Sequence, residues 1–364
     1  MNNVSQRLAE VRPAALDGDP AAVDLAAITA HPQPGPRRSA PRRSLVLAAT
    51  AFAAAVAIAG INQLTHPAGS PAPDPGQVPG ATGAADARQL LLVAAERAAL
   101  QGDGTDRYWH VTSQLGNRYD VGGYFVLGRT ELEEWLPTFA GGKVVKCSTS
   151  LGAEPASDAD VAAWKAAGSP STWTSRPPGG EPGRGRELSA APGQRKCGGG
   201  PEKTYQLGGA DLTPAQVLEL PADPAALKEM ILSSDAAQRT AEGYQPQDLG
   251  RYQSEVLFSA AVELLLRIPV SAPVRSAAYT MLADLPGITT FAQVTDQLGR
   301  PGAGVEYTFR NADGPDQTTR LIVDLTTGAM LAEEHREAGT TALRYYTVVT
   351  ETEFAPEAPA VSAA

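Results

Sequence analysis

The distribution of apolar and polar positions divides the chain into one continuous apolar run and a longer part with periodic patterns. The run Ser44–Ile61 contains no charged side chain. A helix of that length would span about 27 Å, close to the roughly 30 Å hydrocarbon core of a bilayer. We therefore predict a transmembrane helix over residues 44–64. A buried core helix and the apolar segment of a cleaved signal peptide are the alternative interpretations of the run.

Basic residues before this run predict its orientation. Four arginines precede it, at Arg37, Arg38, Arg42 and Arg43, whereas the next basic residue is Arg88. Positively charged flanks stay in the cytoplasm. We therefore expect residues 1–43 to form a short, largely disordered cytoplasmic arm and the C-terminal domain to be extracytoplasmic. The predicted location is the cell membrane, with the lipid bilayer as the partner of residues 44–64.

Composition predicts how the chain is organised beyond the run. Residues 65–87 are rich in Pro, Gly and Ala and have few bulky apolar side chains, so we expect a disordered tether. Residues 88–355 carry periodic patterns and should fold as one extracytoplasmic domain or two that share a sheet. Within them, residues 175–200 are of low complexity and predict a mobile loop. Residues 356–364 predict a disordered tail.

Helical and strand periodicities both occur in residues 88–355, which predicts an α+β fold. Apolar spacing and end signals predict helices at Ala87–Leu100, Ser157–Ala167, Pro214–Leu220, Pro224–Arg239, Leu249–Ile268 and Ser271–Leu285. Alternating patterns predict strands at Tyr108–Leu115, Tyr124–Arg129, Ala303–Arg310, Thr318–Leu325, Ala329–Glu337 and Leu343–Thr352. Turn residues between the later strands favour a twisted antiparallel sheet, with the helices as a middle section.

Charge is distributed unevenly along the chain. The formal net charge is −10, yet residues 1–43 hold six basic and four acidic residues. The acidic excess therefore belongs to the outer part. Because such a surface repels nucleic acid, we predict no nucleic-acid partner.

The chain has two cysteines, Cys147 and Cys197. Both lie outside the membrane in the predicted topology, where an even number of cysteines favours a disulfide. Closing this loop would stabilise the fold by about 4 kcal/mol in the chain-entropy view. Free thiols are the alternative. A metal site would need Cys or His at ligand spacing, which neither cysteine has.

Catalytic motifs are missing from the sequence. It contains no HExxH, GxSxG or Walker-type pattern, and we predict no catalytic residues, no metal site and no cofactor. Acidic residues do occur close together, at Glu133–Glu134, Glu333–Glu334 and Asp158/Asp160. A glycosidase needs two carboxylates at a fixed distance across a cleft. Solvated surfaces and helix caps are the alternative roles of these acidic residues.

All four tryptophans lie within residues 109–173. They are Trp109, Trp135, Trp164 and Trp173. Clustered aromatic side chains are typical of a pocket for a lipid, glycan or peptide, so these residues are the candidate ligand-binding residues. Filling of the core is the alternative.

Several runs of the sequence resemble those of a known family. They are the arginine-flanked anchor, ARQLLLVAAERAA, RYWHV, and the segments Asp160–Trp173, Leu220–Leu232, Val274–Ile288 and Asp324–Glu334. Over residues 37–355 the chain resembles an uncharacterised family of actinobacterial single-pass membrane proteins known only by a locus-tag label. The resemblance implies an extracytoplasmic domain and no particular activity. At the level of fold, the chain is also similar to LolA/RseB-like envelope proteins, whose sheets shelter lipids, lipoproteins or signalling peptides.

These observations together predict a non-enzymatic, membrane-anchored sensor or binding module. Its ligand would be apolar or peptidic, or another envelope protein. A cell-envelope hydrolase that uses a carboxylate pair and a purely structural envelope component are the alternatives. The oligomeric state does not follow from the sequence.

Overall fold

A computed structural model describes residues 84–102, 104, 106–176, 185–245, 249–310 and 315–361. The chain divides into two units, Met1–Pro71 and Ala72–Ala364, and every described residue belongs to the second. The predicted transmembrane span 44–64, the arm and most of the tether lie outside the described residues. In the part of the chain that the structure covers, no helix has the length and apolar character needed to cross a membrane.

The described chain has an α+β fold, as the sequence predicts. The helices are α3 (Ala84–Ala99), α4 (Asp158–Ala166), α5 (Pro214–Leu218), α6 (Pro224–Ala241), the 3-10 turn η3 (Gly250–Tyr252), α8 (Gln253–Leu266) and α9 (Ala272–Ala283). The first strands are β1 (Tyr108–Asp120), β2 (Phe125–Pro137), β3 (Lys143–Pro155), β4 (Thr172–Thr174), β5 (Glu187–Ser189), β6 (Lys196–Glu202), β7 (Tyr205–Leu207) and β8 (Ala210–Leu212). The last strands are β9 (Thr289–Thr295), β10 (Pro301–Phe309), β11 (Gln317–Asp324), β12 (Ala329–Glu337) and β13 (Leu343–Ala355).

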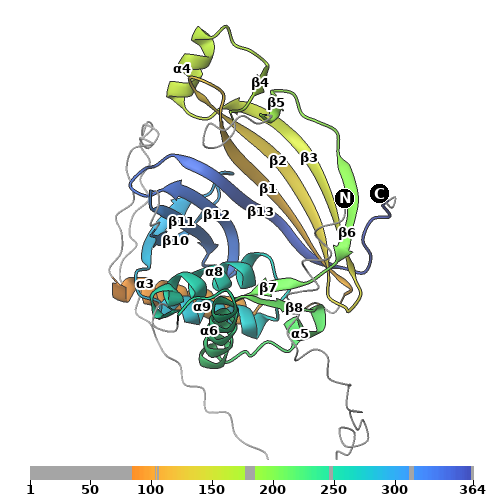
Figure 1. Cartoon of the computed structure of the whole chain (residues 1–364), viewed down its shortest axis with the longest axis vertical. Coiled ribbons are helices and arrows are strands. Elements are labelled where there is room, and N and C mark those ends of the chain that lie inside the picture. The colour runs from red at the N-terminus through yellow and green to blue at the C-terminus, as the bar shows by residue number, and fades with distance from the viewer. Residues whose placement is uncertain are drawn as a thin grey trace, which may run out of the picture. The chain divides into compact units, whose positions relative to one another are not determined.

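One nine-stranded antiparallel sheet dominates the fold, with the strand order β6-β3-β2-β1-β13-β12-β11-β10-β9 (Figure 1). The early strands and the late strands each form a meander. The pairing of β1 with β13, in which Trp109 lies opposite Phe354, joins the two meanders into one sheet. Helices α5, α6, α8 and α9 lie between the two meanders in the sequence.

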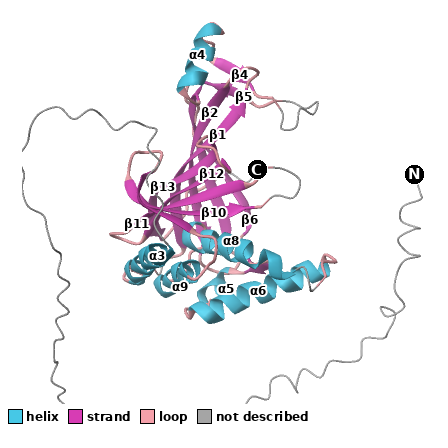
Figure 2. Ribbon diagram, turned by 90° about the vertical axis from the view of Figure 1, so that its left-hand side faces the viewer, coloured by secondary structure: helices cyan, strands magenta, loops and turns pink. Residues whose placement is uncertain are grey.

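The main core lies between the sheet and a layer formed by α3, α6, α8 and α9 (Figure 2). Helix α8 is apolar around most of its circumference, because it packs against both the sheet and its neighbouring helices. From the sheet, alternate residues such as Val305, Leu321 and Val323 enter this core. Intervening residues such as Ile322 belong to a separate cluster on the other face, as strand alternation requires.

The structure confirms most predicted elements and adds others. The predicted helices and the last four predicted strands are present, whereas β1 and β2 are longer than their patterns suggest. Strand β3 was not predicted, because its few bulky residues are mixed with small and polar ones. A bulge also interrupts it next to Gly152, whose φ of +91° is unfavourable for other residues.

The segment 175–200, predicted as a mobile loop, includes strands in the parts that the structure describes. They contain β5 and most of β6, and β6 forms one edge of the large sheet. Backbone pairing with β3 orders this segment although its sequence is rich in glycine. In the predicted disordered tail, two of the described residues have packing contacts: Ala358 and Val361 pack against the cluster that contains Trp135.

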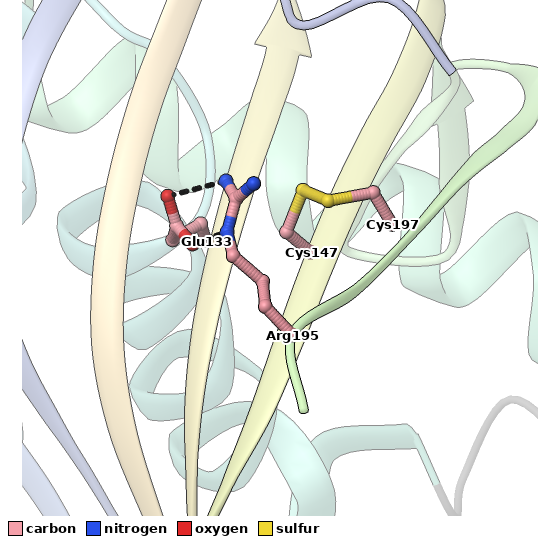
Figure 3. Close-up of a disulfide and its surroundings, with 4 residues drawn as sticks. All are labelled: Glu133, Cys147, Arg195 and Cys197. Carbon is pink, nitrogen blue, oxygen red and sulfur yellow. Dashed lines mark hydrogen bonds and ion pairs between the residues drawn. A yellow bond between two sulfur atoms is a disulfide. The ribbon is translucent and has the colours of Figure 1, made fainter. Parts of the chain in front are cut away.

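The predicted disulfide is present. Cys147 on β3 lies opposite Cys197 on β6, with a Cα–Cα distance of 4.0 Å and bonded sulfur atoms (Figure 3). Beside it, the Arg195 guanidinium donates two hydrogen bonds to the Glu133 carboxylate, at 2.6 and 2.9 Å. A covalent bond and an ion pair thus hold the edge strand to the sheet.

Candidate functional site

A groove along α8 is where titratable and aromatic side chains meet. One hollow of about 370 Å³ lies where α8 faces β10–β13, and it is lined by Glu263, Arg267, Glu333 and other residues. A second hollow of about 300 Å³ continues toward α6 and the β7–β8 hairpin. The two share Ser259, Glu263 and Phe309. We call the pair of hollows the α8 groove.

Strand register explains why the sheet side of the groove is polar. Thr319 on β11 lies opposite His335 on β12, and His335 lies opposite Tyr345 on β13. Glu333 is two residues before His335 and therefore projects from the same face. The regular alternation of three strands thus brings these four residues together beneath α8.

Helical spacing supplies the opposite wall. Glu263 and Arg267 are four residues apart at the end of α8, so they lie one above the other on its surface. The Arg267 Nη1 donates to Glu263 Oε1 at 2.9 Å, and its Nη2 donates to Glu333 Oε2. A single guanidinium therefore joins a carboxylate of the helix to a carboxylate of the sheet.

His335 extends this network along the sheet. Its Nε2 lies 2.8 Å from Glu333 Oε1, and its Nδ1 lies 3.0 Å from Thr319 Oγ1. An ionised carboxylate only accepts hydrogen bonds, so Nε2 carries the proton. The ring also stacks on Tyr345, with 3.9 Å between centroids. Glu333 and Thr319 thus fix the orientation of the imidazole from two sides.

The two carboxylates bound to Arg267 differ in their pKa. Burial is the largest influence on Glu263 and raises its pKa above the ordinary 4.5, since Arg267 offsets only part of the effect. Burial also opposes ionisation of Glu333, but the His335 hydrogen bond and the Arg267 charge outweigh it and lower the pKa below 4.5. Paired groups with opposite shifts are typical of functional sites.

Exposure differs between the same two groups. The Glu263 side chain is 39% exposed and that of Arg267 is 43% exposed, whereas the Glu333 side chain is only 6% exposed. A molecule in the groove could reach Glu263 and Arg267 directly. Glu333 is buried behind Arg267 and would orient the guanidinium rather than contact the ligand.

Aromatic side chains complete the groove. Phe309 lines both hollows and packs edge-on against Phe258 at 5.7 Å and against Tyr307 at 5.0 Å. Tyr345 is 40% exposed at the other end. The groove therefore offers flat apolar surfaces beside charged groups, a combination that suits a ligand with both characters. Within the described ranges, no group of three or more His, Cys, Asp or Glu is placed to hold a metal ion.

The four tryptophans predicted as ligand-binding residues do not meet in one place. Trp109 packs on Phe354 with 4.8 Å between ring centroids, and Trp135 is buried on β2. Trp164 and Trp173 belong to a small separate cluster beside β2 and β3. None of the four lines the α8 groove.

Two of the three acidic pairs seen in the sequence are separated by the fold. Glu133 bonds to Arg195 and Glu134 contacts Lys146 at 2.5 Å, on opposite faces of β2. Glu333 and Glu334 likewise project from opposite faces of β12. Asp158 and Asp160 lie in the first turn of α4, as acidic residues at a helix start do.

Asp160 has a structural role in that turn. The Ser157 hydroxyl accepts a hydrogen bond from the Asp160 N–H at 3.2 Å, which makes Ser157 the N-cap of α4. The Asp160 carboxylate in turn accepts from Phe125 N at 2.8 Å. This carboxylate ties α4 to the start of β2.

No family model, curated protein or solved structure matches the chain. Function therefore has to be inferred from the groove itself. The sequence contained a signal for each of its walls, in the i, i+4 pair Glu263/Arg267 of a predicted helix and the i, i+2 pair Glu333/His335 of a predicted strand. It did not indicate that these two pairs would face each other.

Proposed function

We propose that the protein is a membrane-anchored extracytoplasmic binding module whose α8 groove holds an extended, basic peptide segment. The observation that carries this proposal is that two hollows along α8 share three lining residues, Ser259, Glu263 and Phe309. An elongated groove suits an extended chain better than a compact ligand.

Charge favours a basic ligand. Among the described residues that line the groove, the acidic ones are Asp235, Glu255, Glu263 and Glu333, and the arginines are Arg239 and Arg267. Arg239 is bound to Asp235 by two hydrogen bonds, at 3.0 and 2.9 Å. Arg267 is shared between two carboxylates. The lining therefore has more acidic than basic side chains. A lysine or arginine of the ligand would supply the missing positive charge.

The aromatic walls suit the same ligand. A guanidinium or ammonium beside Phe309 or Tyr345 would gain a cation–π contact, and apolar side chains of a peptide would cover the rest of the rings. The predicted similarity to LolA/RseB-like proteins, some of which hold signalling peptides, would suit the same kind of ligand.

Matched peptides test the proposal. We would measure the fluorescence anisotropy of a labelled, acetylated and amidated peptide with the repeat Gly-Phe-Arg, bound to the full chain. The comparison peptide carries citrulline, a neutral isostere, in place of arginine. We expect the arginine peptide to bind more tightly, and Glu263→Gln to remove most of the difference.

The control is Glu229→Gln, which removes an exposed carboxylate of α6 outside the groove. It should leave both affinities unchanged. Equal binding of the two peptides, or equal loss in both variants, would contradict a basic ligand in this groove. Absence of binding would favour a purely structural envelope component.

A cell-envelope hydrolase is the second candidate function, and one observation favours it. Glu263 and Glu333 line a common cleft with pKa values shifted in opposite directions, as a general acid and an ionised partner require. Incubation of the full chain with purified cell-wall glycan tests it. Release of reducing ends by the natural protein but not by Glu263→Gln would support this function over simple binding.

A further inference from the structure

We propose that a second site, at the base of the sheet, binds a single-chain amphiphile with an anionic head group. A pocket of about 570 Å³ lies where the start of β1, the end of β13, the β2–β3 turn, α5 and the α8–α9 link meet. We call it the basal pocket. It shares no lining residue with the α8 groove, so it would bind its ligand independently.

Apolar side chains form most of the basal pocket. The rings of Phe139 and Phe354 and the side chain of Val270 line it, and Val270 is buried. Leu218 also lines it and is 66% exposed. Leu218 thus adds apolar surface at the edge of the hollow that a hydrocarbon chain could cover. The size falls within the range of small-molecule sites.

The backbone around the basal pocket is held in place. A Cβ on Gly104 would lie 1.9 Å from Phe354 Cδ2, so only glycine lets the chain pass this ring. The Thr138 hydroxyl donates to the Asp106 carbonyl at 2.9 Å, and Thr138 N donates to the Arg107 carbonyl at 2.9 Å. These contacts fix two sides of the hollow before any ligand enters.

Arg107 supplies the charge that selects the head group. Its guanidinium carbon lies 4.1 Å from the centroid of the Phe139 ring, and both residues line the basal pocket. A guanidinium over the face of an aromatic ring can still donate its N–H groups to a carboxylate or phosphate. Asp106 is a neighbouring acidic side chain of the same lining, and it would weaken rather than create the preference for anions.

Trp109 provides a reporter for the basal pocket, because it packs on Phe354 from the sheet side. We would follow tryptophan emission of the full chain, kept free of detergent in an amphipathic polymer, during titration with decanoate, decanol and decylamine. These three probes share a ten-carbon chain and differ in charge. We expect saturable changes with the order of affinity decanoate, decanol, decylamine. Trp109→Phe should remove the signal.

Two substitutions of rim charges separate head-group recognition from chain burial. Arg107→Gln should weaken decanoate binding by about two- to fivefold, the effect expected for an exposed charge pair, and leave decanol unchanged. Asp106→Asn should strengthen decanoate by a smaller factor. Arg344→Gln, at the opposite end of β13, is the matched control and should change neither affinity.

Leu218→Gln tests the apolar part without risk to folding, because this side chain is mostly exposed. It should weaken decanoate and decanol alike. The proposal would be overturned by an equal response to all three probes in every variant, which would indicate nonspecific partitioning. A preference for decylamine, or no saturable change at all, would overturn it as well.

Discussion

Glu333 and Glu334 are neighbours in the sequence but belong to opposite faces of β12, and both bind an arginine. On the helix face, Glu333 binds Arg267 at the edge of the α8 groove. On the other face, Glu334 binds Arg336 and accepts from Gln297 at 2.9 Å. The comparison shows that the same pair of residue types can serve a site that is open to a ligand or a closed part of the fold.

Burial is what distinguishes the two networks. On the closed face the side chains of Glu334 and Arg336 are 1% and 11% exposed, and Arg336 also contacts Glu306 at 3.4 Å. Burial is the largest influence on Arg336 and lowers its pKa although acidic groups oppose the shift. On the open face Arg267 is 43% exposed, and its two carboxylates raise its pKa despite partial burial. We therefore propose that the closed network serves mainly stability and that the open one is accessible to a ligand.

The largest expected effect is on the closed face. Arg336→Met should lower the free energy of unfolding by about 3–5 kcal/mol, because Glu334 would stay buried without its arginine partner. Glu306 would keep its ion pair with Arg320. Denaturant unfolding followed by tryptophan fluorescence measures it. The exposed Arg344→Gln should cost less than about 0.5 kcal/mol. A loss below about 1 kcal/mol for Arg336→Met would show that the closed network is not a major source of stability.

An intermediate effect is expected for Glu333. Glu333→Gln should lower the free energy of unfolding by about 1.5–3 kcal/mol at pH 7, because it removes the negative charge and one of the two oxygens that accept hydrogen bonds from Arg267 and His335. The pKa of Glu333 is lowered in the folded state. Its contribution is therefore present above the ordinary value near 4.5 and is lost as the pH falls through the folded value.

The measurement is the difference in unfolding free energy between the natural protein and Glu333→Gln from pH 7 down to pH 3. The difference should shrink at the acid end. A difference that stays constant over this range would contradict the lowered pKa of Glu333.

Glu263→Gln should have the opposite pH dependence and a smaller size. Because burial raises the pKa of Glu263, this group favours folding below its unfolded value near 4.5, and that contribution is lost as the pH rises through the folded value. At pH 7 the variant should be as stable as the natural protein or more stable, by less than about 1 kcal/mol for such an exposed pair. If the unfolding free energy that Glu263→Gln loses grew with pH, Glu263 would instead be a stabilising group like Glu333.

The smallest effect on stability is expected for Tyr345. Tyr345→Ala removes an exposed ring of the α8 groove and should change the unfolding free energy by less than about 1 kcal/mol. Binding of the arginine peptide should nevertheless weaken, because a cation–π surface is lost. Loss of stability without loss of affinity would reverse the assignment of roles.

The sequence patterns predicted most helices and strands but not the tertiary contacts between them. Helical spacing identified α8, and alternation identified β11 and β12, because both periods reflect a buried face. The pairing of β1 with β13 was not predictable, since it joins Trp109 to Phe354 across most of the domain. Glu333 was visible as one of two adjacent acids, but its link to Glu263 depends on how α8 lies over the sheet.

Carboxylate labelling of the full chain tests the difference between the two faces most directly. Carbodiimide and glycine amide modify accessible carboxyl groups, and peptide mass spectrometry locates them. The acetylated, amidated arginine peptide has no reacting group of its own. We predict that Glu263 is labelled in the free protein and protected by the peptide, whereas Glu334 is labelled in neither case. Labelling of Glu334 at the rate of Glu263, or a Glu263 rate unchanged by the peptide, would contradict the account.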